Sequence, residues 1–262
     1  MIDPIKSYYE NYDEDGRLLS RSGSVEFFTT KRYIDRYIKP GDSVLEIGAG
    51  TGRYSHAFAR LGYSVDAVEL IEHNINIFRQ NITPGESVTI RQGNAMDLSF
   101  FDDNTYDITL LLGPMYHLFT AEDKLTALRE AIRVTKPGGV IFTAYCISDL
   151  SVLVSGFKRR DFSVVDMIEK GFIDPVTFAA SSEPSLYFEI VRKEHIDDLM
   201  AQLPAARLHY VASDGYTYHM RDEINAMEDA EFDLYLKYHF ATCERADMVG
   251  LSAHTIDIFR KD

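Results

Sequence analysis

The chain has 262 residues, 45% of them hydrophobic and 26% charged, which suffices for one substantial core and argues against intrinsic disorder. Its formal net charge of −14 disfavours nucleic acid as a partner, because binding to a phosphate backbone requires clustered lysine and arginine. With only two cysteines, the chain has no disulfide framework. It contains no apolar run of membrane-spanning length, and its beginning is polar and acidic, so we expect a cytoplasmic protein without a membrane partner.

The first predicted helix precedes the first strand. Apolar residues recur at helical spacing from Ser24, a possible N-cap, to Ile38, and Pro40 then prevents the helix from continuing. We therefore divide the chain into an N-terminal helical cap, residues 1–40, and a main domain, residues 41–262.

A short apolar strand and a glycine turn come next. Residues 43–47 are apolar except at Ser43 and Glu46, which suits a buried parallel strand, and a helical pattern begins at Arg53. Between them lies the turn Gly48-Ala49-Gly50-Thr51-Gly52. Its backbone and the following helix N-terminus can approach an anionic ligand closely. The spacing is G-x-G-x-G and differs from the dinucleotide fingerprint, whose third glycine would fall at Arg53.

An acidic residue ends the second strand. Residues 65–70 form an apolar run that contains Glu69, about 20 residues beyond the first glycine, where a carboxylate can accept from both hydroxyls of a nucleoside ribose. A helix over 72–81 and a strand over 88–91 follow, and this strand leads into a loop at 93–97.

The alternation of strand and helix continues after the loop. We predict a strand over 107–112, a helix over 120–134 that begins with a capping box of Thr120 and Asp123, and a strand over 140–144. This order predicts an α/β fold with a doubly wound, mostly parallel sheet and right-handed crossovers.

These motifs together resemble the class I S-adenosylmethionine-dependent methyltransferases. The resemblance rests on EIGAGTG at 46–52 with Glu69, GNAMDL at 93–98, YDITLLLGPMYHL at 106–118 and REAIRVTKPGG at 129–139, and it covers about residues 40–145. It implies a Rossmann-like fold with a seven-stranded sheet, an antiparallel last strand over 255–259, and S-adenosyl-L-methionine as cofactor.

The resemblance also implies a set of cofactor-binding residues. In similar proteins with such a leader, the N-terminal segment folds over the cofactor, which makes Arg17, Tyr8 and Tyr9 candidates for contact. Many members carry aspartate where this chain has Asn94, whose side-chain oxygen can still accept from the adenine amino group. The full set is Arg17, Glu46, Gly48, Ala49, Gly50, Gly52, Glu69, Leu70, Asn94, Ala95, Met96 and Leu112.

Acceptor chemistry is expected where the fourth strand ends, because in this family the end of that strand faces the transferable methyl group. His117 could act as a general base there, and Tyr116 could orient the acceptor or line the methyl path. Both residues could instead serve only to pack and stabilise the loop.

Two regions interrupt the regular pattern and are predicted as lid insertions, at about 145–185 and 213–250. A strand over 186–191, a helix over 195–203 and a strand over 207–212 separate them, and the second contains a helix around 223–242. Their many aromatic residues and the acidic total charge favour an amine or another small nitrogen or oxygen acceptor.

We therefore predict a methyltransferase that acts on a small-molecule nitrogen or oxygen acceptor. A nucleic-acid methyltransferase is disfavoured because Leu112-Gly113-Pro114-Met115 lacks the polar residue that such enzymes place before proline. A protein acceptor and a catalytically silent S-adenosylmethionine-binding protein remain alternatives. No metal-ligand spacing is present, and the pattern gives no indication of the oligomeric state.

Overall fold

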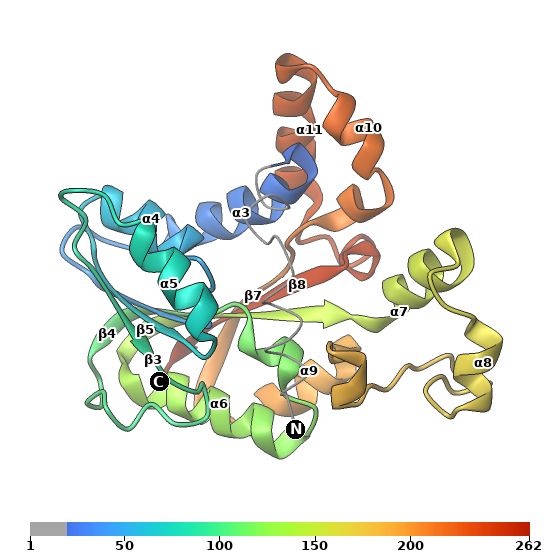
Figure 1. Ribbon diagram of the computed structural model, residues 1–262, viewed down its shortest axis with the longest axis horizontal. Coiled ribbons are helices and arrows are strands. Elements are labelled where there is room, and N and C mark those ends of the chain that lie inside the picture. The colour runs from blue at the N-terminus through green and yellow to red at the C-terminus, as the bar shows by residue number, and fades with distance from the viewer. Residues whose placement is uncertain (1–19) are drawn as a thin grey trace.

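The computed structural model describes residues 20–262, in which one sheet forms the centre of the molecule (Figure 1). Its strands run in the order β3-β2-β1-β4-β5-β8-β7, and the short β6 pairs with β5 beside this path. The strands are β1 Ser43–Ile47, β2 Ser64–Glu69, β3 Val88–Gln92, β4 Tyr106–Leu111, β5 Thr135–Ile147, β6 Ile190–Val191, β7 Ala205–Ala212 and β8 His254–Lys261. All pairs are parallel except those of β8 with β5 and β7, which confirms the predicted fold class.

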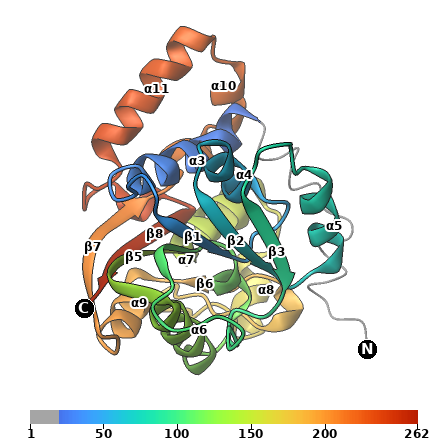
Figure 2. The ribbon, with the colours of Figure 1, turned by 90° about the vertical axis from the view of Figure 1, so that its left-hand side faces the viewer.

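Helices cover both faces of the sheet (Figure 2). The α-helices are α3 Arg21–Ile34, α4 Arg53–Arg60, α5 Glu72–Gln80, α6 Ala121–Val134, α7 Ser148–Ser151, α8 Val164–Glu169, α9 Lys193–Met200, α10 Arg221–Ala226 and α11 Asp229–Thr242. Apolar residues of α3 and α4 pack with one face, and those of α6 and α9 with the other. Both faces are therefore buried, which explains the nearly continuous apolar runs of the central strands.

The first and last predicted helices differ from expectation at their ends. Ser20 is the N-cap of α3, because its Oγ accepts from the N–H of Gly23 at 3.0 Å. Ser24 lies inside the first turn, where its Oγ donates to the carbonyl of Arg21. The helix predicted around 223–242 is split into α10 and α11, and both contribute to one apolar cluster on α3, through Ile224 and Phe232.

The strand predicted over 186–191 is mostly irregular. Only Ile190 and Val191 pair, with Cys146 and Ile147 at the end of β5. A short 3-10 helix, η3 Pro184–Leu186, occupies the beginning of the predicted strand.

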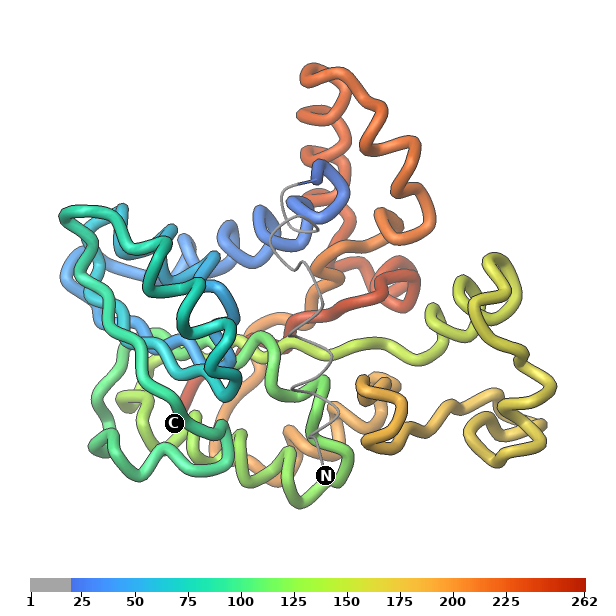
Figure 3. The backbone as a smooth tube through the Cα atoms, in the orientation of Figure 1, coloured from blue at the N-terminus to red at the C-terminus, as the bar shows by residue number. Residues whose placement is uncertain are grey.

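The two predicted insertions contact each other. The first leaves the end of β5, forms α7, the π-helix η2 Val152–Arg159 and α8, and returns to β6 (Figure 3). The second forms the 3-10 helix η4 Gly215–His219, then α10 and α11 beside α3. Lys158 and Arg159 donate to the carbonyls of His219 and Tyr218, so the two insertions form one assembly beyond the end of β5.

Candidate active site

The glycine turn after β1 needs backbone conformations that other residues adopt only with strain. Gly48, Gly50 and Gly52 have φ angles of 76°, 55° and 94°. A Cβ on Gly48 would lie 2.5 Å from Cδ of Pro114, so the turn also requires the absence of a side chain there. The N–H groups of Gly48 and Ala49 donate to the carbonyl of Val68, which holds the turn against the end of β2.

Glu69 ends β2 and stands beside this turn. Its Oε2 accepts from the N–H of Gly50 and its Oε1 from the N–H of Ile71, each at 2.9 Å. Burial raises the pKa of this carboxyl, and the same backbone N–H groups oppose the rise. Sequence reasoning found Glu69 but not Asn74, which donates to Oε1 from α5; no sequence signal distinguished Asn74 from other polar residues of that helix.

Glu46 lies in β1, directly before the turn. It is buried and accepts from both the N–H and the Oγ of Ser55 at the start of α4. Burial raises the pKa of its carboxyl to about 7, although the Ser55 hydrogen bonds lower it. Glu46 thus joins β1 to α4 and holds a proton at pH values at which an ordinary glutamate has lost it.

A cavity of about 340 Å³ runs along the carboxyl ends of β1, β2 and β4. Every predicted cofactor residue within 20–262 lines it except Gly52, and so do Tyr116 and His117. Gly52 lies behind the turn as the N-cap of α4, where a Cβ would meet His56 and Phe78. Arg17, Tyr8 and Tyr9 lie outside the described residues. Lining residues that we did not predict include Glu26, Thr51, Tyr54, Ile71 and Asn74.

Asn94 begins the loop after β3. Its Oδ1 accepts from the N–H of Met96 at 3.0 Å, and its carbonyl accepts from the N–H of Asp97. An amide oxygen has two lone pairs, so the Oδ1 that braces this loop can still accept from a ligand. Asp97 accepts from the N–H of Ser99 and braces the same loop.

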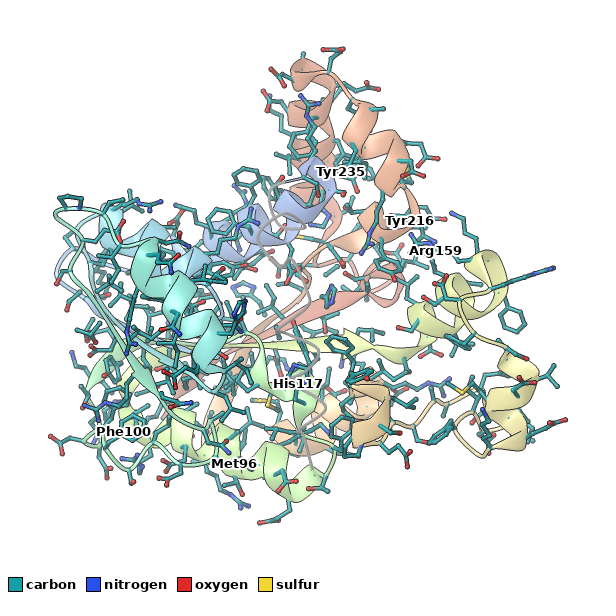
Figure 4. All side chains as sticks on the ribbon, in the orientation of Figure 1. Met96, Phe100, His117, Arg159, Tyr216 and Tyr235 are labelled. Carbon is teal, nitrogen blue, oxygen red and sulfur yellow. The ribbon has the colours of Figure 1, made fainter. Side chains whose placement is uncertain are left out.

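The opposite end of the cavity is formed by the 3-10 helix η1 Pro114–His117, which follows β4. Nδ1 of His117 hydrogen-bonds to the carbonyl of Tyr187 at 2.9 Å; a carbonyl only accepts, so Nδ1 donates and a neutral ring carries its lone pair on Nε2. The N–H of Glu189 donates to the carbonyl of Tyr116. Tyr187 and Glu189 belong to the segment that returns from the first insertion, so these two hydrogen bonds hold that segment against η1. Figure 4 labels His117.

Within residues 20–262 we find neither a metal site nor a membrane-spanning helix. No group of three or more histidine, cysteine or acidic residues in this range could hold a metal ion. No helix in the same range is long and apolar enough to cross a membrane.

Comparisons with known proteins agree with this arrangement. A family model described as "Methyltransferase domain" matches residues 44–139, which include the glycine turn, Glu69, Asn94 and η1. The strand order around these residues, with one antiparallel strand between β5 and β7, is that of the Rossmann-like methyltransferase fold. Residues 44–139 are thus a methyltransferase domain of the class I S-adenosylmethionine-dependent type.

Curated members of this family match only part of the chain. It is 29% identical over 169 residues to demethylmenaquinone methyltransferase of Bacillus subtilis (strain 168), covering 60% of this chain and 66% of that protein. It is 28% identical over 143 residues to ribosomal protein L11 methyltransferase of Listeria monocytogenes serotype 4b (strain CLIP80459), covering 53% and 43%. The chain thus spans less than two thirds of the length of these relatives.

Solved structures with the same fold match nearly the whole chain. A protein from Pyrococcus horikoshii OT3 superposes with a TM-score of 0.64 at 16% identity, covering 98% of this chain and 99% of that one. A possible histamine N-methyltransferase from Thermotoga maritima gives 0.55 at 17% identity and covers both chains completely. At such identities the likeness establishes the fold alone.

The cofactor of this family is S-adenosyl-L-methionine, and the residues present fit it. The cavity combines the glycine turn, the buried carboxylate of Glu69 and the polar loop at Asn94.

Proposed function

We propose that this methyltransferase-family protein transfers a methyl group from S-adenosylmethionine to a nitrogen or oxygen atom of a small molecule. The supporting observation is that one cavity joins the Glu69 and Asn94 end, suited to a nucleoside, to the Tyr116 and His117 end beside the insertions. S-adenosylmethionine supplies an electrophilic methyl group on a sulfonium sulfur. The protein therefore needs mainly to align the acceptor, exclude water and remove a proton where the acceptor carries one.

The individual residues have separate tasks in this proposal. Glu69 accepts from the ribose hydroxyls, Asn94 accepts from the adenine amino group, and the turn at Gly48 and Gly50 lets the backbone approach the cofactor. Tyr116 and His117 border the path of the methyl group. The insertions at 145–185 and 213–250 act as lids that close the acceptor side.

The relatives' names suggest other acceptors, a quinone precursor and a ribosomal protein. A small polar acceptor is favoured by a second cavity of only about 180 Å³, whose wall shares Glu26 with the first. The formal charge of −14 disfavours nucleic acid. A catalytically silent cofactor-binding protein on the same fold would have the same first cavity, so an activity measurement must separate it from an enzyme.

Two measurements test the proposal in turn. Calorimetry should show binding of S-adenosylhomocysteine and no binding of nicotinamide dinucleotides. Isotope transfer from methyl-labelled S-adenosylmethionine should then label members of amine or phenol pools, with RNA and protein extracts as parallel acceptors. Dinucleotide binding without S-adenosylhomocysteine binding would overturn the cofactor assignment, and labelling of the macromolecules alone would overturn the acceptor class.

A further inference from the structure

The second cavity lies between α3, the segment after β7 and the beginning of β8. Its wall includes Glu26 from α3, Asp214, Arg221 from α10 and His254 from β8. Two contacts join it to the cofactor cavity: Glu26 lines both, and the ring of Tyr116 in the first lies 5.8 Å from the ring of His254 in the second. A molecule in the second cavity would therefore lie next to the methyl end of the first.

Asp214 and His254 form a hydrogen-bonded pair in this wall. Oδ2 of Asp214 accepts from Nδ1 of His254 at 2.9 Å, and its Oδ1 accepts from the N–H of His254 and from Ser252. Asp214 is buried, and its neighbours hold its pKa below the ordinary value although burial alone would raise it, so it stays an acceptor. Nδ1 then carries a proton, and a neutral ring has its lone pair on Nε2, the ring nitrogen that Asp214 does not contact.

This geometry points to a site for a small alcohol or phenol in the second cavity, with Nε2 of His254 as the group that takes the hydroxyl proton. The inference rests on the proposed function, which leaves the acceptor and the proton-removing residue open. A carboxylate that orients an imidazole through Nδ1 and stabilises the imidazolium is an established arrangement for activating a hydroxyl.

The methyl transfer balances in protons and charge with only the hydroxyl acceptor, S-adenosylmethionine and His254. The acceptor oxygen forms its bond to the methyl carbon, the electron pair of the broken carbon–sulfur bond stays on sulfur, and the hydroxyl proton moves to Nε2. The sulfonium charge is thereby replaced by the imidazolium charge of His254, beside Asp214 and near Glu26, whose Oε2 lies 3.9 Å from Nδ1. The proton returns to solvent in a later step.

Groups from several elements determine the charge of His254. Burial alone would lower the pKa of His254. Three neighbours outweigh burial and raise the pKa well above the ordinary value: Cys146 opposite it on β5, Glu26 on α3 and Asp214. Tyr116 and Arg221 also face the ring. At neutral pH the ring is therefore mostly protonated, and turnover should rise with pH as the ring loses its proton. A cationic ring also repels an ammonium acceptor, which favours a neutral hydroxyl.

Three variants test the inference: His254→Gln, Asp214→Asn and the control His209→Gln. His209 is a matched control because its Nδ1 contacts a carboxylate, Glu244, at 2.8 Å but it lines neither of the two cavities. Circular dichroism establishes that each variant folds. Nitrogen-15 NMR of the histidine rings, without cofactor, should show a His254 pKa above that of a free histidine in the wild type and a lower one in Asp214→Asn.

Phenol and catechol serve as probes in ligand-observed NMR and in isotope transfer. His254→Gln should weaken probe binding about tenfold and lower turnover by roughly 10²–10⁴-fold, while the control changes neither and S-adenosylhomocysteine binding persists in all variants. Equal probe binding and turnover in His254→Gln and wild type would overturn the inference, as would labelling of the amine pool alone, and both leave the proposed function standing. If the wild type does not bind S-adenosylhomocysteine, the proposed function is wrong. The probe-binding experiment would still show whether the second cavity binds phenol or catechol.

Discussion

The backbone N–H of Gly50 donates to Oε2 of Glu69 over 2.9 Å, which ties the turn after β1 to the end of β2. The other oxygen of Glu69 accepts from the N–H of Ile71. The carboxylate that we propose as the ribose ligand therefore also stabilises the glycine turn. Substitutions of Glu69 should consequently change both direct binding and the shape of the turn.

We expect Glu69→Ala to weaken S-adenosylhomocysteine binding by roughly 1–3 kcal/mol, since it removes hydrogen bonds made by a charged acceptor. Glu69→Gln should lose less, because one acceptor oxygen remains. Calorimetry measures both, and Glu72→Ala, an exposed change at the start of α5, is the control. Wild-type affinity in a correctly folded Glu69→Ala would refute the ribose assignment.

Gly48→Ala and Gly50→Ala should differ in their effect on stability. Both positions have positive φ, which costs an alanine roughly 1–2 kcal/mol. At Gly48 the new Cβ would also lie 2.5 Å from Pro114, an overlap that adds roughly 1–3 kcal/mol, whereas Gly50 has open space. Urea unfolding should therefore rank Gly48→Ala as the less stable variant. Equal loss in the two variants would contradict the close approach of Pro114.

The ionisation of Glu46 should make stability depend on pH. Its carboxyl has a pKa of about 7 in the folded chain against 4.5 as the ordinary value, so between these pH values the folded protein holds a proton that the unfolded chain has released. Stability therefore falls as the pH rises through this window, and the loss is complete above it.

The variant Glu46→Gln isolates this effect because it cannot ionise. The free energy of unfolding of the variant relative to the wild type should increase by roughly 3 kcal/mol between pH 4.5 and 7. Urea titrations at several pH values measure this difference, and contributions from other groups cancel in it. Parallel pH profiles for the two proteins would show that folding does not raise the pKa of Glu46.

Variants at the end of β4 distinguish positioning from proton removal. His117→Ala should raise the Michaelis constant with less than about a tenfold loss of turnover, because Nδ1 of His117 holds the carbonyl of Tyr187 and thereby shapes the acceptor side. Tyr116→Phe keeps the ring that contacts His254 and should remain close to wild type. A loss of turnover of roughly 10²–10⁴-fold in His117→Ala, with cofactor binding unchanged, would make His117 the proton acceptor in place of His254.

The cofactor half of the molecule could be predicted from sequence because its signals are local. The strand at 43–47, the glycine turn and Glu69 lie within 27 consecutive residues, 43–69, and each has a specific backbone or charge requirement. Parallel strands place their carboxyl ends at one edge, so the order of elements alone brings Glu69 and Asn94 together. Of the predicted cofactor residues within 20–262, only Gly52 does not line the cavity; it is the N-cap of α4.

The second cavity was determined by tertiary structure. Glu26, Asp214 and His254 are separated by as many as 228 residues, and each occupies an unremarkable position in its own segment. They meet because α3 packs on the face of β8 that carries His254, while the chain turns after β7 to bring Asp214 beside the same strand. Periodicity predicts which face of an element is buried, but it contains no information about which distant elements share a cavity. The sequence therefore determined the fold and the cofactor, whereas packing between distant segments decided which residues line the second cavity.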